Sequence, residues 1–394
     1  MLEQYLQTLA CYERYWRFSP FACLNPPWDK QLNARLLALT AADIAELAQD
    51  SHQCLEFFSH WFPTLKVLPP MAQTKVAAAV PAFPFWLTNG IAGRKLAQIE
   101  ALIANISLPE GHLVEWCAGK GHLGRLLSFS QHHEVVSIEW RQALCDAGQQ
   151  LAEHYQIAQR FIQADVLQDD LGDHLQRADG AVALHACGDL HVALMRQATK
   201  HDTDHLFIAP CCYHLTHAKR YIGLSQQGQQ LIHQYFTEPG YTITSAHIKL
   251  AVQEQVTAGA RVARLREQEV QWRLAYQGLY EWVTGAHHYR PLPSVSKHWF
   301  SGEFEEFVQW AAQYHGIVLP PHIDIERWLA HGETARLQVA RLDLVRHLFR
   351  RPLEAMLVLD RATFLAEHGY QVQISEFCNY HLTPRNFLIS ACRA

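Results

Sequence analysis

The sequence predicts an α/β protein with a Rossmann-like sheet of seven strands, a helical N-terminal domain and a helical insertion. Three observations lead to this prediction. Short apolar runs alternate with helical stretches between residues 94 and 220, a glycine-rich turn follows the first run, and two further strand-like runs close the chain. Alternation at this spacing is typical of a parallel sheet with helices on both faces.

Each expected element is a short segment with its own hydrophobic pattern. Five strands are predicted at 112–116, 134–139, 160–165, 180–185 and 205–210. Helices are predicted at 94–103, 123–129 and 144–155, and from the end of the fourth strand to Met195. A helix at 353–368 and strands at 370–374 and 387–391 are expected to complete the same sheet.

The chain is expected to divide into four segments. These are a helical N-terminal domain at 1–93, a cofactor-binding core at 94–220, a helical insertion at 221–345 that includes long helices, and a C-terminal helix with two strands at 346–394. Four aromatic residues of the first segment are expected to be buried in a core rather than to form an exposed platform. They are Trp16, Phe18, Phe21 and Trp28.

Composition excludes several classes of protein. With 49% hydrophobic residues in 394, a sizeable core can form and global disorder is excluded. The net charge of −5 excludes a uniformly basic nucleic-acid coat, although it allows a local basic patch. Ten cysteines without a Cys-x-x-Cys pair signal neither a zinc ribbon nor a disulfide scaffold. The most apolar stretch, 76–87, is too short to cross a bilayer, so a cytoplasmic protein is expected.

The glycine-rich turn follows the first predicted strand and precedes a helix. It is expected to bind a cofactor, because an acid on the strand and small residues after it let the backbone approach a ligand closely. The expected contacts are Glu115, Cys117, Ala118, Gly119, Lys120 and Gly121.

Two further acids follow the second and third strands. Glu139 lies where an acid can hydrogen-bond ribose hydroxyls, and Asp165 lies where it can accept from an adenine amino group. Together with the turn, they form the pocket that S-adenosyl-L-methionine needs in a class I methyltransferase. Three unrelated acids at strand ends are the alternative, and a dinucleotide dehydrogenase is disfavoured because the turn is not Gly-x-Gly-x-x-Gly.

Cysteines and histidines follow the fourth and fifth strands and are expected to converge beside the transferable methyl group. One interpretation is a histidine general base, with His185 also touching the cofactor. A second is a cysteine nucleophile, as in cytosine-carbon methylation. A third is zinc binding, for which the adjacent cysteines make an awkward chelate, and a fourth is plain packing of buried thiols. The residues concerned are His185, Cys187, Cys211, Cys212 and His214.

These motifs resemble the methyltransferase domain shared by the ribosomal-RNA-adenine-dimethylase-domain-containing proteins and their methyltransferase-like relatives. The similarity extends over about 94–220 and 353–394. It is carried by Glu115–Leu123, Leu184–Leu190, Cys211–His214, Leu359-Asp360-Arg361 and the Thr-Pro-Arg-Asn run at 383–386, in which Thr383 replaces the family's serine.

A more distant likeness is to the tRNA acceptor-stem ribose 2′-O-methyltransferases. Their His-x-Cys-Gly and Cys-Cys-His-His motifs correspond to His185–Gly188 and Cys211–His214, with Tyr213 departing from the pattern. Their N-terminal zinc finger has no counterpart here. The resemblance implies an S-adenosylmethionine-dependent enzyme acting on RNA, either tRNA or rRNA, at a ribose hydroxyl or a base.

A substrate surface is expected on the helical insertion and at the start of the C-terminal segment that follows it. Arginines there could bind phosphates and aromatic residues could stack bases, whereas the alternative is a solvated helix with arginine–glutamate pairs. A cytosine-carbon methyltransferase and a non-catalytic RNA assembly factor remain the alternative functions. The residues concerned are Arg261, Arg264, Arg266, Arg273, Arg336, Arg341, Arg346, Arg350, Arg351, Trp272, Tyr276, Tyr280 and Trp282.

Overall fold

The computed structural model describes residues 1–71, 82–236, 242–253 and 260–394. The chain forms two compact units, each assembled from segments that are distant in sequence. The first, here called the sheet unit, contains Met1–Cys11, Leu68–Val256 and Arg350–Ala394. The second, the helical unit, contains Tyr12–Val67 and Thr257–Phe349.

This division differs from the four predicted segments. The predicted N-terminal domain at 1–93 is shared between the two units, and the predicted insertion at 221–345 is divided near Val256. Such a division depends on contacts between segments that are distant in sequence, and local hydrophobic patterns carry no information about these contacts.

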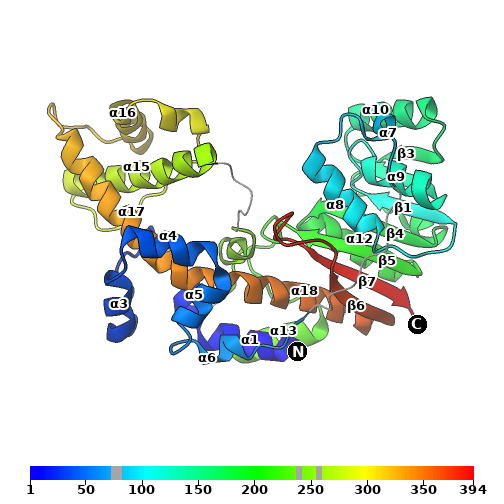
Figure 1. Cartoon of the computed structure of the whole chain (residues 1–394), viewed down its shortest axis with the longest axis horizontal. Helices are drawn as coiled ribbons and strands as arrows, with labels where there is room; N and C mark the ends of the chain where they lie inside the picture. The colour runs from blue at the N-terminus through cyan, green and yellow to red at the C-terminus, as the bar shows by residue number, and fades with distance from the viewer. Residues whose placement is uncertain (72–81, 237–241, 254–259) are drawn as a thin grey trace. The chain divides into compact units, whose positions relative to one another are not determined.

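The sheet unit contains all seven predicted strands (Figure 1). Their order across the sheet is β3-β2-β1-β4-β5-β7-β6. The first five pair in parallel, whereas β7 runs antiparallel to both β5 and β6. The strands are β1 (His112–Trp116), β2 (Glu134–Glu139), β3 (Gln159–Gln163), β4 (Gly180–Cys187), β5 (His205–Cys211), β6 (Tyr370–Glu376) and β7 (Phe387–Arg393).

Strand order reverses between β1 and β4. The chain proceeds outward from β1 through β2 to β3, then returns to place β4 on the other side of β1. In open parallel sheets, the crevice at the carboxyl ends of the strands beside such a reversal is where ligands bind. The fold therefore assigns the ends of β1, β2, β4 and β5 to a binding site.

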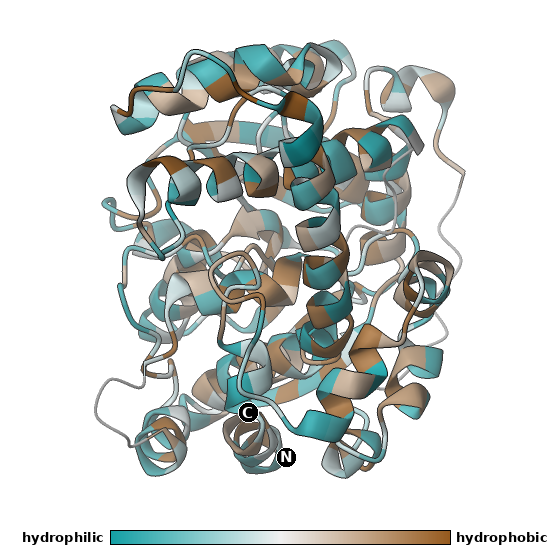
Figure 2. Cartoon of the chain, turned by 90° about the vertical axis from the view of Figure 1, so that its left-hand side faces the viewer, coloured by the Kyte–Doolittle hydropathy of each residue, from teal (hydrophilic) through white to brown (hydrophobic). Residues whose placement is uncertain are grey.

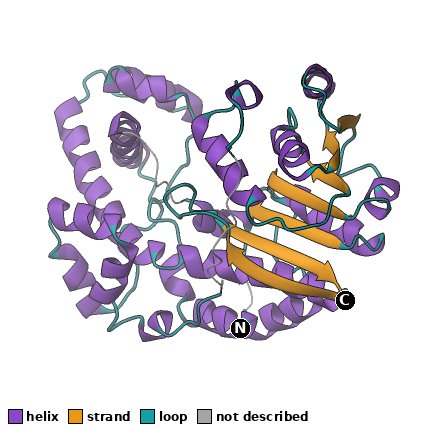
Figure 3. Ribbon diagram, turned by 45° about the vertical axis from the view of Figure 1, so that its right-hand side comes forward, coloured by secondary structure: helices purple, strands orange, loops and turns teal. Residues whose placement is uncertain are grey.

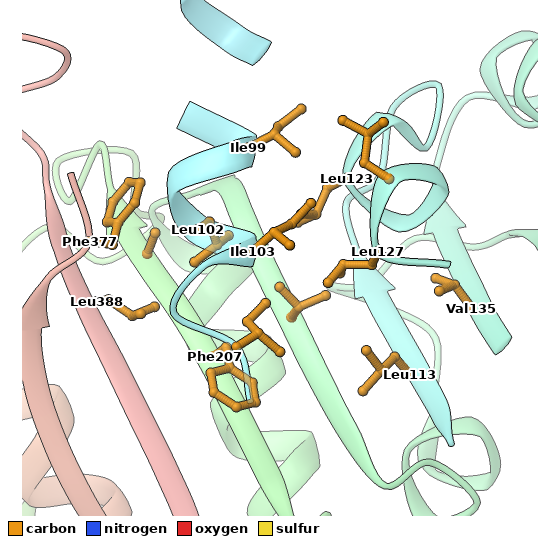
Figure 4. Packing of buried hydrophobic residues seen from close by; sticks show 14 of the residues in the cluster. Ile99, Leu102, Ile103, Leu113, Leu123, Leu127, Val135, Phe207, Phe377 and Leu388 are labelled. Atoms are coloured by element: carbon orange, nitrogen blue, oxygen red, sulfur yellow. The ribbon is translucent and has the colours of Figure 1, made fainter. Parts of the chain in front are cut away.

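Two amphipathic helices bury one face of this sheet. Helix α8 (Gly93–Ile103) contributes Ile99, Leu102 and Ile103, and helix α9 (His122–Gln131) contributes leucines that meet Leu113 of β1 (Figure 4). Burial of each such side chain stabilises the fold by about 1.5–3 kcal/mol before entropy is counted. The turn between β1 and α9 is thus held between two firmly packed elements.

Further helices surround the strands of the sheet unit (Figure 3). Helix α12 packs on β4, and α18 packs on β6 and β7 and also contacts α1 and α13. They are α1 (Leu2–Cys11), α7 (Phe85–Thr88), α10 (Gln142–His154), α11 (Gly172–Gln176), α12 (Asp189–Lys200), α13 (Gln226–Tyr235), α14 (Ser245–Ile248), the 3₁₀ turn η1 (Lys249–Val252) and α18 (Arg350–Glu367).

The helical unit has an aromatic core between its long helices. Trp272, Tyr276 and Phe307 are buried in this core, and many of its helices present separate hydrophobic and hydrophilic faces (Figure 2). The helices are α2 (Glu13–Trp16), α3 (Lys30–Leu37), α4 (Ala41–Gln49), α5 (Ser51–Phe57), α6 (Pro63–Lys66), α15 (Ala260–Thr284), η2 (Lys297–Ser301), α16 (Phe304–His315) and α17 (Ile325–His347).

The expected burial of the early aromatic residues is confirmed for two of the four, whereas Phe18 and Phe21 are half-buried. Trp16 and Trp28 are buried, and Phe18 packs edge-on against Trp28 with ring centroids 5.2 Å apart. Among the described residues, no helix is both long and apolar enough to cross a membrane. Half of the apolar stretch at 76–87, residues 76–81, lies outside the part of the chain that the structure describes.

Candidate active site

The turn after β1 is closed by its own backbone. The Gly121 N–H donates to the Ala118 carbonyl at 3.0 Å, and the Ala118 N–H donates to the Ile138 carbonyl of β2 at 2.9 Å. Cys117, Gly119 and Gly121 all have positive φ angles, of 57°, 61° and 65°. Such a run of left-handed residues turns the chain sharply into α9 and favours glycine.

The two glycines of the turn have different surroundings. A Cβ atom added at Gly121 would lie 2.3 Å from Phe161 and from the Gln159 side chain, whereas one added at Gly119 would meet no atom of the described structure within 4 Å. Gly121 is therefore required by packing within the protein. Gly119 instead borders open space, which is what a backbone that approaches a ligand needs.

Glu139, at the end of β2, binds this turn directly. Its Oε2 accepts from the Gly119 N–H at 2.9 Å, and its Oε1 accepts from the Arg141 N–H at 3.1 Å. Each carboxylate oxygen has two lone pairs, so these bonds leave capacity for hydroxyl donors from a ligand. The geometry fixes the predicted ribose acid against the predicted glycine turn.

Asp165 lies two residues beyond the end of β3 and is half-buried. Its Oδ1 accepts from the Leu167 N–H at 3.0 Å, and its own N–H donates to Asp169 at 2.7 Å. The carboxyl group is thus held in a local turn that begins at the carboxyl end of the sheet.

Glu115 lies beneath the turn rather than beside it. Its side chain is 3% exposed, and its Oε2 accepts from the Ser137 hydroxyl at 2.6 Å. Burial raises the pKa of Glu115 to about 7, against the effect of the hydrogen bonds from Ser137 and Gly124 and of the charges on Lys95 and Arg125. A Cβ atom at Gly124 would collide with this carboxyl group, so α9 approaches β1 closely at that position.

The three cysteines after β4 and β5 come together as predicted. The sulfur atoms of Cys187, Cys211 and Cys212 all lie within 4.8 Å of one another. Cys187 and Cys211 are paired residues of the two parallel strands, with their sulfur atoms 3.5 Å apart. Hydrogen bonds from the other two thiols lower the pKa of Cys212, whereas the pKa values of Cys187 and Cys211 are raised.

The two histidines flank this group without joining it. His185 is exposed and has a φ of 68°, and desolvation by the surrounding protein together with the charge on Lys95 lowers its pKa. Burial likewise lowers the pKa of His214, whose buried Nδ1 has no hydrogen-bond partner among the residues that the structure describes. At neutral pH both imidazoles are therefore neutral and able to accept a proton.

Backbone strain marks the same edge of the sheet. Cys117 follows β1, Cys212 follows β5, and His185 lies near the end of β4, where the register with β5 is irregular. These three strands are neighbours, and each of the three residues adopts a positive φ although none is a glycine. Such conformations cost of order 1 kcal/mol each and tend to cluster at functional sites.

A buried polar network supports the loop after β5, and sequence reasoning did not predict it. Tyr213 donates to Glu354 of α18 at 3.3 Å, and Glu354 accepts from Arg351 at 2.8 Å. Arg351 also donates to the Asn386 side chain at 2.8 Å. The signals for this network in the sequence were the Leu-Asp-Arg motif at 359–361 and the Thr-Pro-Arg-Asn run at 383–386.

A second buried pair in this network fixes a histidine. The Nε2 of His191 accepts from Arg361 Nε at 2.7 Å, and its Nδ1 lies 2.9 Å from the Ala186 carbonyl, which can only accept. His191 is therefore neutral and protonated on Nδ1. Burial and the Arg361 charge lower its pKa to about 3, which agrees with this assignment.

The predicted substrate surface is largely absent from the helical unit. Trp272, Tyr276 and Tyr280 are buried in the aromatic core, so the prediction that they stack bases is wrong. Arg273 pairs with Glu269 and Arg336 with Glu333, as the alternative of ion pairs at helical spacing predicted. Arg261, Arg264 and Trp282 remain exposed.

A cavity of about 490 Å³ lies elsewhere in the sheet unit. Its lining includes His112, Glu134, Gln159 and Arg177, so it lies at the amino-terminal ends of β1, β2 and β3. None of the predicted cofactor contacts lines it. Volume alone therefore does not identify the candidate site, which rests on the glycine turn at the opposite end of the strands.

Comparison with known proteins finds one similarity, in the core. Residues 94–219 match a family model described as a methyltransferase domain, which covers about a third of the chain. No curated protein sequence matches the chain. These residues are therefore similar to a methyltransferase domain, and the strand order confirms the predicted Rossmann-like sheet of seven strands.

Solved structures with partial similarity include TYW2 and two methyltransferases. M. jannaschii TYW2 in complex with AdoMet is 16% identical over 30% of this chain and 52% of its own, with a TM-score of 0.26. Geranyl diphosphate C-methyltransferase from Streptomyces coelicolor is 11% identical over 39% and 63%, with a TM-score of 0.25. A TehB-like SAM-dependent methyltransferase from Corynebacterium glutamicum is 14% identical over 40% and 73%, with a TM-score of 0.22. The match thus spans about half the length of TYW2.

Proposed function

We propose that the protein transfers the methyl group of S-adenosylmethionine to RNA, at a ribose hydroxyl or a base. The observation that carries the proposal is the bond between Glu139 and the Gly119 N–H, beside a Gly119 Cα that faces open space. This arrangement provides a carboxylate acceptor and an accessible backbone at one point of the strand-end crevice. Both are what an adenosyl group with an amino-acid tail requires.

In this proposal, different residues of the crevice bind different parts of the cofactor. The turn at 117–121 holds the methionine end, Glu139 accepts from the ribose hydroxyls, and Asp165 accepts from the adenine amino group. Glu115 acts as a positioning residue, because it is hydrogen-bonded beneath the turn. The cofactor supplies an electrophilic methyl group, and the protein supplies its alignment with the acceptor.

His185 is the proposed general base for the acceptor. It lies near the carboxyl end of β4, at the same edge of the sheet as the turn, and it is exposed. Its lowered pKa leaves the imidazole neutral near pH 7. A neutral imidazole can remove or relay the proton of a hydroxyl or amine as the methyl group is transferred. His214 is the second candidate for this role.

Cationic groups at the crevice and, separately, on the helical unit support an RNA acceptor. Lys120 is exposed in the glycine turn, and the charges of Lys95 and Arg385 both act on His185. Exposed Arg261 and Arg264 add positive charge to the helical unit. Lysine and arginine bind phosphates in this way, and the resemblance of the motifs to RNA-modifying families points to the same substrate class.

The test is methyl transfer from S-adenosyl[methyl-³H]methionine to fractionated tRNA, rRNA, protein and metabolite pools, each prepared from cells that lack the protein. We expect incorporation into RNA, and nucleoside mass spectrometry then identifies the modified atom. His185→Ala is expected to reduce transfer while cofactor binding persists, and exposed His381→Ala is the matched control. Cofactor binding without RNA methylation, or methylation of another pool alone, contradicts the RNA assignment.

A further inference from the structure

Three thiols from two strands converge at the edge of the crevice. Cys187 ends β4, Cys211 ends β5, and Cys212 follows at once, with all three sulfur atoms within 4.8 Å of one another. Nothing in the proposed methyl transfer uses these thiols. Packing needs only the small volume of a buried thiol, and it does not require three sulfur atoms to lie together.

Backbone geometry explains how adjacent cysteines can act together. Successive side chains of an extended strand point to opposite faces, so Cys211 and Cys212 would normally diverge. Cys212 instead has a φ of 46°, which breaks the alternation just after β5. Its sulfur atom is thereby brought to the side of Cys211 and Cys187.

The spacing of the sulfur atoms fits a tetrahedral metal. Zn–S bonds of about 2.3 Å place two thiolates of a tetrahedral zinc about 3.8 Å apart. Cys187 and Cys211 lie 3.5 Å apart, and the whole group lies within 4.8 Å, so only small side-chain adjustments are needed.

An unused nitrogen donor lies two residues beyond the last thiol. The Nδ1 atom of His214 is buried and has no hydrogen-bond partner among the described residues. Three thiolates leave one position of a tetrahedron. His214 lies outside the group of sulfur atoms, so water can fill this position, or the imidazole can do so after the loop moves.

We propose that Cys187, Cys211 and Cys212 bind a zinc ion at the carboxyl ends of β4 and β5. Thiolates favour soft and borderline metals such as zinc over magnesium or calcium, which take oxygen ligands. Binding exchanges the three thiol protons for the metal, with no change of oxidation state. The ion would link the two strand ends and the loop that carries His214. This proposal is independent of the methyl acceptor.

The first experiment measures metal content in the full chain, purified under reducing conditions without a histidine tag. The protein is loaded with zinc, desalted, and analysed by mass spectrometry of the metal. We expect one zinc ion per chain in the wild type. Cobalt loaded in its place is expected to give near-ultraviolet thiolate-to-cobalt absorption, which histidine or carboxylate ligands alone do not produce.

Variants locate the ion. Cys187→Ser and Cys212→Ser are each expected to lower zinc retention at least tenfold and to remove the cobalt absorption. The control is Cys11→Ser/Cys392→Ser, which changes two exposed cysteines outside the group and should retain one zinc ion. Circular dichroism establishes that each variant is folded.

Several results overturn the proposal. They are a reduced wild-type protein that retains no zinc, cobalt absorption that persists in both Cys187→Ser and Cys212→Ser, and zinc loss in the control alone. A wild-type protein that gives no thiolate-to-cobalt absorption overturns the proposal even if the serine variants fail to fold.

Discussion

Gly119 and Gly121 have similar positive φ angles but opposite surroundings. Replacing either with alanine incurs the same left-handed strain, of about 1–2 kcal/mol. At Gly121 the new methyl group also collides with Phe161 and Gln159, which adds about 1–3 kcal/mol of overpacking. At Gly119 it projects into open space, so the two substitutions separate packing from ligand binding.

We therefore expect Gly119→Ala to fold with a small loss of stability and to bind S-adenosylhomocysteine at least about tenfold more weakly, equivalent to about 1.4 kcal/mol. Gly121→Ala is expected to lose more stability than Gly119→Ala. Urea unfolding and calorimetric titration measure the two effects. Equal loss of stability in both variants, with unchanged ligand affinity in Gly119→Ala, would show that the turn does not contact a cofactor.

The buried Glu115 carboxyl group predicts a pH effect on stability. Its pKa is raised to about 7 in the folded chain from an ordinary value of 4.5, so the unfolded chain releases this proton more readily. Its contribution to stability is therefore full below pH 4.5 and is lost as the pH rises through 7, by about 3 kcal/mol. Glu115→Gln removes this titration while keeping an acceptor for Ser137.

The measurement is the free energy of unfolding of wild type and Glu115→Gln at pH 5 and pH 8. The free energy of unfolding of the variant minus that of the wild type should be larger at pH 8 than at pH 5, by an amount of order 2–3 kcal/mol. A difference between the two proteins that stays constant over this range would show that the carboxyl group is not buried as described.

At the scale of elements, α18 holds α13 through two acidic residues. Asp360 is 1% exposed and accepts from the Ser225 N–H and hydroxyl and from the Leu224 N–H, as well as from Tyr221. Ser225 in turn caps α13 by accepting from the Gly228 N–H. Glu367 accepts from two further N–H groups of the same helix but is exposed.

Asp360→Ala leaves several buried donors unpaired and is expected to cost about 3 kcal/mol or more. Glu367→Ala, the matched control, is expected to cost about 1 kcal/mol, because water can replace the lost acceptor. Chemical denaturation measures both, and hydrogen exchange of α13 locates the effect. A larger cost for Glu367→Ala than for Asp360→Ala would contradict the described network.

The strands were predictable because each is a compact apolar run with a clear boundary. The convergence of Glu139 with the turn, and of the three cysteines with one another, followed from the rule that parallel strands end at a common edge. The position of Glu115 did not follow, because it was assigned to the crevice by its place beside the turn. Strand alternation puts it on the same face as Leu113, which packs under α8 and α9.

The supporting groups on α18 could not be predicted from local pattern. Glu354 and Arg361 are charged residues within an amphipathic helix, where a solvated position is the ordinary expectation. Their burial depends on Tyr213 and His191, which are more than a hundred residues away in sequence. Only tertiary structure brings these partners together.

At the scale of the whole molecule, the proposed RNA substrate requires local positive charge on the protein, because the chain as a whole is acidic. The net charge is −5, so phosphate contacts should be few and strongly dependent on salt. Arg261→Ala/Arg264→Ala is expected to weaken RNA binding and to reduce the slope of log affinity against log salt by about 1–2. Arg336→Gln is the control, since Arg336 already pairs with Glu333.

Fluorescence anisotropy with labelled RNA between 50 and 200 mM salt, roughly the range over which such contacts weaken, measures the slope. Equal slopes for wild type and the Arg261→Ala/Arg264→Ala variant would exclude these arginines from the RNA surface. If only Arg336→Gln loses affinity for RNA, the RNA-binding surface includes the paired arginines instead of Arg261 and Arg264.

The most direct test of the central claim is calorimetric titration of S-adenosylhomocysteine into wild type, Glu139→Ala and the control Glu134→Ala. Glu134 is the first residue of β2, at the opposite end of the strand from Glu139. We predict one binding event in the wild type and in Glu134→Ala, and binding at least about tenfold weaker in folded Glu139→Ala, equivalent to about 1.4 kcal/mol. Absence of binding to the wild type, or equal affinity in all three proteins, would contradict the assignment of this crevice as the cofactor site.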